Sequence, residues 1–174
     1  MKKAMCTIFC LTVLFYIFPV TAYENDFSDN AITVFQELRK LDEESRAAFM
    51  SGNRDFQKEK GELLTATKDK YNKILKSLPG EYCADPQENL LKGFIQTLIG
   101  SNDEYPTYVF AELYACDPGK VEKEILSLEP EPKRKIFDDL EWGFKNIKYK
   151  IESLPNYNEL KEKLKNLKST IRGK

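Results

Sequence analysis

Apolar residues recur every three or four positions through most of the chain, and this spacing constrains the fold more than any other feature. The longest run has steps of 4, 4, 3, 4 and 3 positions and comprises Ile136, Leu140, Phe144, Ile147, Ile151 and Leu154. Such steps place side chains on one face of an α-helix, whereas a half-buried strand requires strict alternation. Alternating runs bounded by turn residues are almost absent. We therefore predict an all-α fold with no sheet.

Turn and capping residues divide this pattern into about six or seven helices, which form a compact bundle. Residues 23–28 are expected to be a loose tail before a first helix at 30–50, which carries Phe49 near its end. A second helix covers 54–78 and ends at Pro79.

The remaining expected helices follow the same logic. Asp85 and Asp117 each precede a proline and are expected to cap the third and fifth helices. The fourth helix covers 106–115. The last two helices carry seam-like apolar spacing and are predicted to pair antiparallel, the first ending before Pro155 and the second covering 157–171.

The N-terminus has the layout of a secretory signal peptide. Lys2 and Lys3 precede an uncharged, mostly apolar run that ends in Val20, Thr21 and Ala22. We predict a signal peptide at 1–22, an extracellular or periplasmic location, and a single all-helical domain at 23–174. The alternative is an uncleaved membrane anchor, because the run reaches the roughly 20 residues that span a bilayer.

Cleavage after Ala22 would leave two of the four cysteines, Cys83 and Cys116. Two cysteines in an exported chain predict one disulfide, and the alternative is a pair of buried free thiols. Cys83 precedes the expected third helix and Cys116 follows the fourth. The disulfide is therefore expected to close the base of a helical hairpin.

The chain contains no histidine, which removes most catalytic and metal-binding chemistry. Histidine-dependent nucleophiles and zinc sites are excluded, and neither a Gly-rich phosphate loop nor a calcium-binding loop occurs. Carboxylates such as Glu44, Asp138 and Asp139 are the remaining catalytic class, but acids also gather in the first turns of ordinary helices. We predict that the protein is not an enzyme, with no catalytic residue, metal or cofactor, and that it does not bind nucleic acid.

Charge is distributed unevenly along the predicted mature chain. Residues 143–174 hold nine bases and three acids, whereas residues 23–142 hold 16 bases and 25 acids. A basic last helix can dock on an anionic membrane surface or an acidic protein partner. The alternative is a solvated face, or a helix that packs on the acidic part of its own chain.

Binding is the function class that remains. Aromatic residues gather in the expected fourth and sixth helices: Tyr105, Tyr108, Phe110, Tyr114, Trp142, Phe144 and Tyr149. Helical bundles often hold apolar ligands between facing helices, although aromatics at helical spacing are also typical of a core. We predict a binding protein for a small apolar ligand, with unknown ligand-binding residues. The alternative is a protein–protein interaction module, such as an effector or an envelope accessory, with no internal ligand.

Two segments resemble the nematode fatty-acid- and retinol-binding proteins. They are residues 125–140, which contain ILSLEPE and IFDDL, and residues 38–49, with the sequence LRKLDEESRAAF. The resemblance implies a small, secreted, nearly all-helical protein that holds a fatty acid or retinoid. Cys83 and Cys116 depart from that family's usual pattern, so no binding residue is carried over.

Overall fold

The computed structural model describes residues 21–53 and 55–173, which form eight α-helices and no β-strand. The predicted all-α fold is thus confirmed. Most of the predicted signal peptide, including Cys6 and Cys10, lies outside the described residues. No helix in the described part combines the length and the apolar character needed to cross a membrane. The helices are α1 (Thr21–Met50), α2 (Asp55–Ala84), α3 (Glu88–Leu98), α4 (Glu104–Cys116), α5 (Pro118–Ser127), α6 (Pro130–Asn146), α7 (Lys148–Ile151) and α8 (Tyr157–Arg172).

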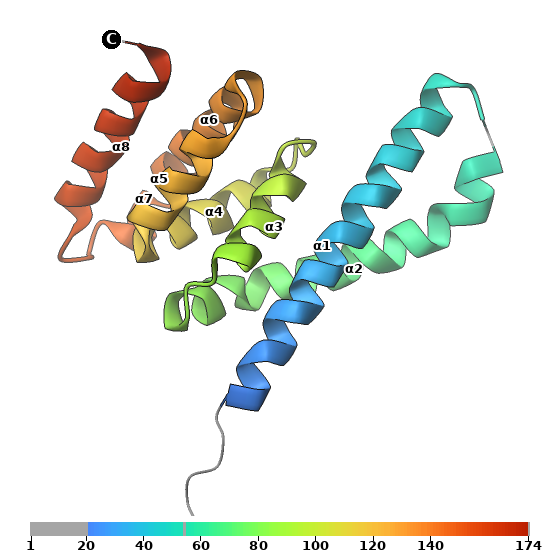
Figure 1. Cartoon of the computed structure of the whole chain (residues 1–174), viewed down its shortest axis with the longest axis horizontal. Coiled ribbons are helices and arrows are strands. Elements are labelled where there is room, and N and C mark those ends of the chain that lie inside the picture. The colour runs from blue at the N-terminus through green and yellow to red at the C-terminus, as the bar shows by residue number, and fades with distance from the viewer. Residues whose placement is uncertain (1–20, 54, 174) are drawn as a thin grey trace, which may run out of the picture.

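The two longest helices, α1 and α2, form a hairpin whose closed end projects away from the other helices (Figure 1). The opposite half of this hairpin joins the bundle, where α1 contacts α3 and α2 contacts α4. α4 also contacts α5 and α6, and α8 packs on α5 and α6. The result is a bundle with one two-helix arm.

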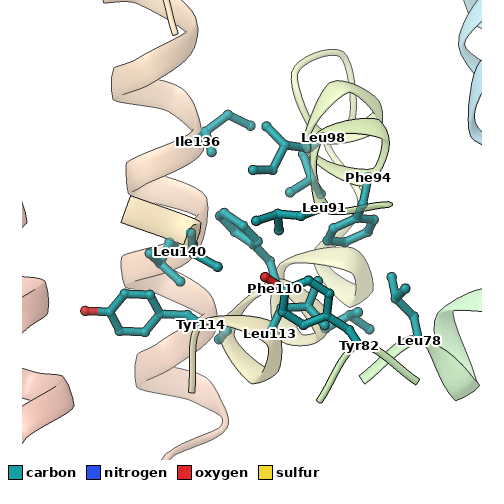
Figure 2. Close-up of a cluster of buried hydrophobic side chains, with 14 of the residues drawn as sticks. Leu78, Tyr82, Leu91, Phe94, Leu98, Phe110, Leu113, Tyr114, Ile136 and Leu140 are labelled. Carbon is teal, nitrogen blue, oxygen red and sulfur yellow. The ribbon is translucent and has the colours of Figure 1, made fainter. Parts of the chain in front are cut away.

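The core lies where α2, α3, α4 and α6 meet (Figure 2). α4 is buried along most of its circumference, because it has neighbours on several sides. The other helices bury one face each and leave most of their charged residues in water, with Glu124 of α5 as a buried exception. The fully buried large side chains of this region include Leu78, Tyr82, Leu91, Phe94, Leu98, Phe110, Leu113 and Tyr114.

Two predicted boundaries in the first half of the chain are wrong. α1 begins at Thr21, so residues 23–28 are helical and are not a loose tail. Ser28 is buried and Phe27 packs against the core, which explains why the helix extends this far. α2 continues through Pro79 to Ala84. A proline inside a helix costs about 3 kcal/mol, and burial of Leu78 and Tyr82 on either side offsets that cost.

Of the two predicted helix caps, Asp117 is confirmed and Asp85 is wrong. Asp117 caps α5, because its Oδ1 accepts a hydrogen bond from the Lys120 backbone N–H at 3.0 Å. Asp85 does not cap α3, because Gln87 occupies the N-cap position without a side-chain cap. The Asp85 carboxylate instead accepts a hydrogen bond from Gln87 Nε2 at 2.9 Å.

The long helix predicted up to Pro155 is broken. α6 ends at Asn146 and α7 starts at Lys148, with Ile147 between the two helices. Ile147 and Ile151 are nevertheless buried, whereas Leu154 at the end of the apolar run is exposed. The break turns the chain towards α8 while it keeps both isoleucines in the core.

The predicted disulfide is present. Cys83 and Cys116 are bonded, with their Cα atoms 5.4 Å apart. Because α2 does not stop at Pro79, Cys83 lies in its last turn, and Cys116 is the last residue of α4. The bond therefore ties the C-terminal end of α2 to that of α4, and the loop that it closes contains α3 and α4.

Candidate functional site

The most distinctive hollow on the described surface is an open groove of about 790 Å³ between α6 and α8. α8 reaches this place because Leu160, Leu164 and Leu167 bury one of its faces against the bundle. The groove is open to solvent and is not an enclosed chamber in the core. We call it the α6–α8 groove. Its lining comprises Asp138, Glu141, Trp142, Phe144, Lys145, Lys148, Tyr157, Lys161, Glu162, Leu164, Lys165, Lys168 and Arg172.

Stacked aromatic rings form much of the apolar part of this groove. Trp142 lies parallel to Tyr108, with ring centroids 5.4 Å apart. Phe144 lies parallel to Tyr157, with centroids 5.9 Å apart. Trp142 keeps 39 % of its surface exposed, so its ring is available to a ligand while its neighbour holds it in place.

Ion pairs neutralise one end of the groove. Lys168 pairs with Glu141, and Arg172 pairs with Asp138 at 2.7 Å. Both pairs connect α8 to α6 across the groove and help to hold the two helices together. Because the groups are partly exposed, each pair contributes at most about 1 kcal/mol.

The other basic residues of this part of the chain are also mostly paired. Six of the eight described bases between 143 and 173 lie within 4 Å of a carboxylate: Lys148, Lys150, Lys163, Lys165, Lys168 and Arg172. Three of the pairs, those of Lys150, Lys168 and Arg172, reach acids of the preceding helices, and the other three join residues three or four positions apart.

The two unpaired bases of that segment are Lys145 and Lys161, and both line the α6–α8 groove. Neither has a carboxylate partner among the described residues. The Lys161 ammonium lies 5.8 Å from the centre of the Tyr157 ring, a weak cation–π contact. The groove thus offers two uncompensated positive charges beside an aromatic surface, an arrangement that suits a ligand with an apolar body and an anionic end.

Each of the three carboxylates that the sequence singled out lies beside a basic residue. Glu44 lies on α1, 4.0 Å from Lys40, and Asp138 is paired with Arg172. Burial raises the pKa of Asp139 above its ordinary value, although its bond to Lys135 at 2.7 Å opposes the shift. No group of three or more His, Cys, Asp or Glu residues that could hold a metal ion occurs in the described part of the chain.

A second open hollow, of about 540 Å³, lies between α1 and α3. Its lining includes Ile32 and Phe35, but also the amide residues Gln36 and Gln96. Arg39 points to this hollow and is already engaged, with Glu43 at 3.0 Å and Gln96 at 3.3 Å. It is a poorer candidate for an apolar ligand than the α6–α8 groove.

The structure separates the predicted aromatic residues into three groups. Phe110 and Tyr114 are core residues, while Tyr105 and Tyr149 are exposed outside the groove. Trp142 and Phe144 line the groove, and Tyr108 supports Trp142 from behind. The sequence pattern does not single out Tyr157, Leu164 or Lys161 as ligand-binding residues. The predicted pairing of the last two helices is the one signal that places their facing residues together.

No protein-family model, curated protein or solved structure matches this chain. The groove is therefore the feature of this chain from which a function can be inferred.

Proposed function

We propose that the protein is an exported, non-enzymatic binding protein that holds a small apolar ligand with an anionic end, such as a fatty acid or retinoid, in the α6–α8 groove. The observation that supports this proposal most directly is the position of Lys145 and Lys161. They are the two described bases of the C-terminal segment without a carboxylate partner, and they flank an exposed aromatic surface.

In this proposal the two ends of the ligand meet different parts of the groove. The hydrocarbon part lies against Trp142, Tyr157 and Leu164, where burial of apolar surface favours binding by about 25 cal/mol per Å². The carboxylate accepts hydrogen bonds from the ammonium groups of Lys145 or Lys161. Such charge-assisted bonds are stronger than neutral ones and fix the orientation of the ligand.

The chain carries its own reporter for a test, because Trp142 is the single tryptophan. Titration of the mature protein with oleate and with retinoic acid should change Trp142 emission saturably. The Lys161→Ala variant should bind oleate about tenfold more weakly, whereas Lys161→Arg should retain most of the affinity. An uncharged alcohol of the same chain length should bind weakly to the unaltered protein and equally weakly to Lys161→Ala.

Lys163→Ala is the matched control. Lys163 is on the same helix, pairs with Glu159 at 2.9 Å and does not line the groove. This variant should bind oleate with unchanged affinity. Absence of any emission change with all the ligands, or an equal loss of affinity in Lys161→Ala and Lys163→Ala, would disprove the proposal.

The second candidate is a protein–protein interaction module, and the openness of the groove favours it. An amphipathic helix with acidic residues could lie along the same aromatic strip and contact the same two lysines. This function predicts that oleate leaves Trp142 emission unchanged. It also predicts that an acidic amphipathic helical peptide shifts the emission and loses affinity in Lys161→Ala.

A further inference from the structure

The closed end of the α1–α2 hairpin presents two adjacent apolar side chains to solvent. Phe49 is 87 % exposed and Met50 is 86 % exposed, far more than any other large apolar side chain in the described surface except Tyr149. The two residues are the last two of α1, at the end of the arm that projects from the bundle (Figure 1). Burial of a large apolar side chain is strongly favourable, so exposure of two neighbours at a projecting end needs a functional reason.

Backbone hydrogen bonds close the turn at this end of the hairpin. The Gly52 N–H donates to the Phe49 carbonyl at 3.2 Å, and the Asn53 N–H donates to the Ala48 carbonyl at 2.8 Å. Gly52 has a φ of 69°, the left-handed conformation that ends a helix in this way. Asn53 Oδ1 then accepts a hydrogen bond from the Asp55 N–H, which starts α2. The turn thus satisfies these polar groups without help from water.

We propose that this apex, residues 49–53, docks on a lipid bilayer by inserting Phe49 and Met50 into its interfacial region. A bilayer accepts an apolar side chain without a complementary pocket, and it admits backbone whose hydrogen bonds are made internally. The apex presents two exposed apolar side chains, and the backbone N–H groups of Ser51, Gly52 and Asn53 are bonded within the turn. This inference is independent of the ligand in the α6–α8 groove.

The small size of the apex argues against a protein partner or a second copy of the chain. Two large side chains bury roughly 300–500 Å², whereas a stable protein interface buries about 1,200–2,000 Å² in total. The apex is also convex, so a partner would need a deep pocket to enclose both side chains. A bilayer has neither requirement.

The charges beside the apex indicate which lipids it needs. Residues 44–62, which flank the apex on both sides, contain four bases and four acids: Arg46, Arg54, Lys58 and Lys60 against Glu44, Asp55, Glu59 and Glu62. With no net charge there, insertion should depend on apolar contact and should not require anionic lipid. Docking through the lysines of α8 would instead require anionic lipid and weaken with salt.

Flotation of the mature protein with phosphatidylcholine vesicles tests the proposal. The unaltered protein should float with the vesicles, and the Phe49→Ser/Met50→Ser variant should lose at least about tenfold in partition coefficient. The matched control is Leu126→Ser/Tyr149→Ser, which removes two other exposed apolar side chains, 41 % and 78 % exposed. This control should float like the unaltered protein.

A tryptophan moved to the apex gives a second measurement. The Phe49→Trp/Trp142→Phe variant should show a blue shift of emission with phosphatidylcholine vesicles, and the shift should persist in high salt. Three outcomes would overturn the proposal: no flotation with phosphatidylcholine, equal flotation of the apex variant and the protein, or flotation only with phosphatidylglycerol. Loss of self-association in the apex variant, seen by sedimentation in the absence of lipid, would assign the apex to a second copy instead.

Discussion

Gly143 of α6 lies directly against the backbone of Thr107 in α4. A Cβ atom at position 143 would overlap the Thr107 carbonyl oxygen and would lie 3.3 Å from the Cβ of Ala111. Both Gly143 and Thr107 are buried, at the contact between two of the most closely packed helices of the bundle. The absence of a side chain at this position therefore sets how closely α6 can approach α4.

Gly143→Ala should destabilise the fold, because the obstructing atom is backbone and cannot rotate away. We expect a loss of at least 1–3 kcal/mol in the free energy of unfolding, the usual range for overpacking. Urea denaturation followed by circular dichroism measures it. Gly80→Ala is the control, since a Cβ at position 80 meets nothing within 4 Å. Removing a helical glycine there should stabilise by about 0.5–1 kcal/mol, and similar effects of both substitutions would contradict this account.

Reduction of the Cys83–Cys116 bond should lower stability substantially. The bond closes a loop across a sequence separation of 33 residues, for which chain entropy gives about 3.5–4 kcal/mol. Thermal unfolding with and without dithiothreitol measures the loss. The Cys83→Ala/Cys116→Ala variant should match the reduced protein, and dithiothreitol should not affect it further.

Alkaline pH should destabilise the protein through three buried tyrosines. Burial raises the pKa of Tyr71, Tyr82 and Tyr114 above the ordinary value of 10.0. The phenols therefore stay protonated in the folded state, while the unfolded chain ionises them from about pH 10. Stability is then fully present below pH 10 and falls above it, by up to about 1.4 kcal/mol per pH unit for each tyrosine.

The urea midpoint measured from pH 8 to pH 11.5 tests this dependence. Tyrosinate absorbance of these three residues should appear together with loss of the helical signal. Full ionisation of all tyrosines in a protein that is still folded would show that the three phenols are not protected.

Tyr82→Phe should stabilise the protein or leave it unchanged. The Tyr82 hydroxyl is buried without a hydrogen-bond partner among the described residues, and such a group costs about 1–3 kcal/mol. Tyr114→Phe is the comparison, because the Tyr114 hydroxyl donates to Glu122 at 3.0 Å. That variant should lose about 1 kcal/mol. Chemical denaturation of both variants measures these changes in the free energy of unfolding. A larger loss of stability in Tyr82→Phe than in Tyr114→Phe would indicate that the Tyr82 hydroxyl has a partner.

Local sequence signals predicted some elements well and others poorly. Asp117 followed by Pro118 predicts a helix start, and α5 begins there in the structure. The prediction succeeds because the Asp117 side chain bonds to a backbone N–H only three residues away. Pro79 was expected to end a helix and does not, because burial of Leu78 and Tyr82 carries the helix through it. The first is a local interaction, while the second depends on contacts with distant segments.

The same contrast applies to the candidate site. The sequence identified a cation-rich C-terminal segment and an aromatic sixth helix. It did not distinguish the lysines of that segment that are paired with an acid from those that are not. Lys150 is paired because Glu112 of α4 lies beside it, and Lys161 is unpaired because the described structure places no acid there. Which lysines face the groove follows from how α6 and α8 pack.

By itself, the sequence determined that the chain is helical and that Cys83 pairs with Cys116. Periodicity predicts the apolar face of each helix, and of the four cysteines only Cys83 and Cys116 lie outside the predicted signal peptide. Only the tertiary structure decided which apolar faces are covered. Phe35 and Phe49 both lie in the first predicted helix, yet Phe35 is buried and Phe49 is exposed. The reason is that the bundle covers α1 around Phe35 and leaves the far end of the hairpin uncovered.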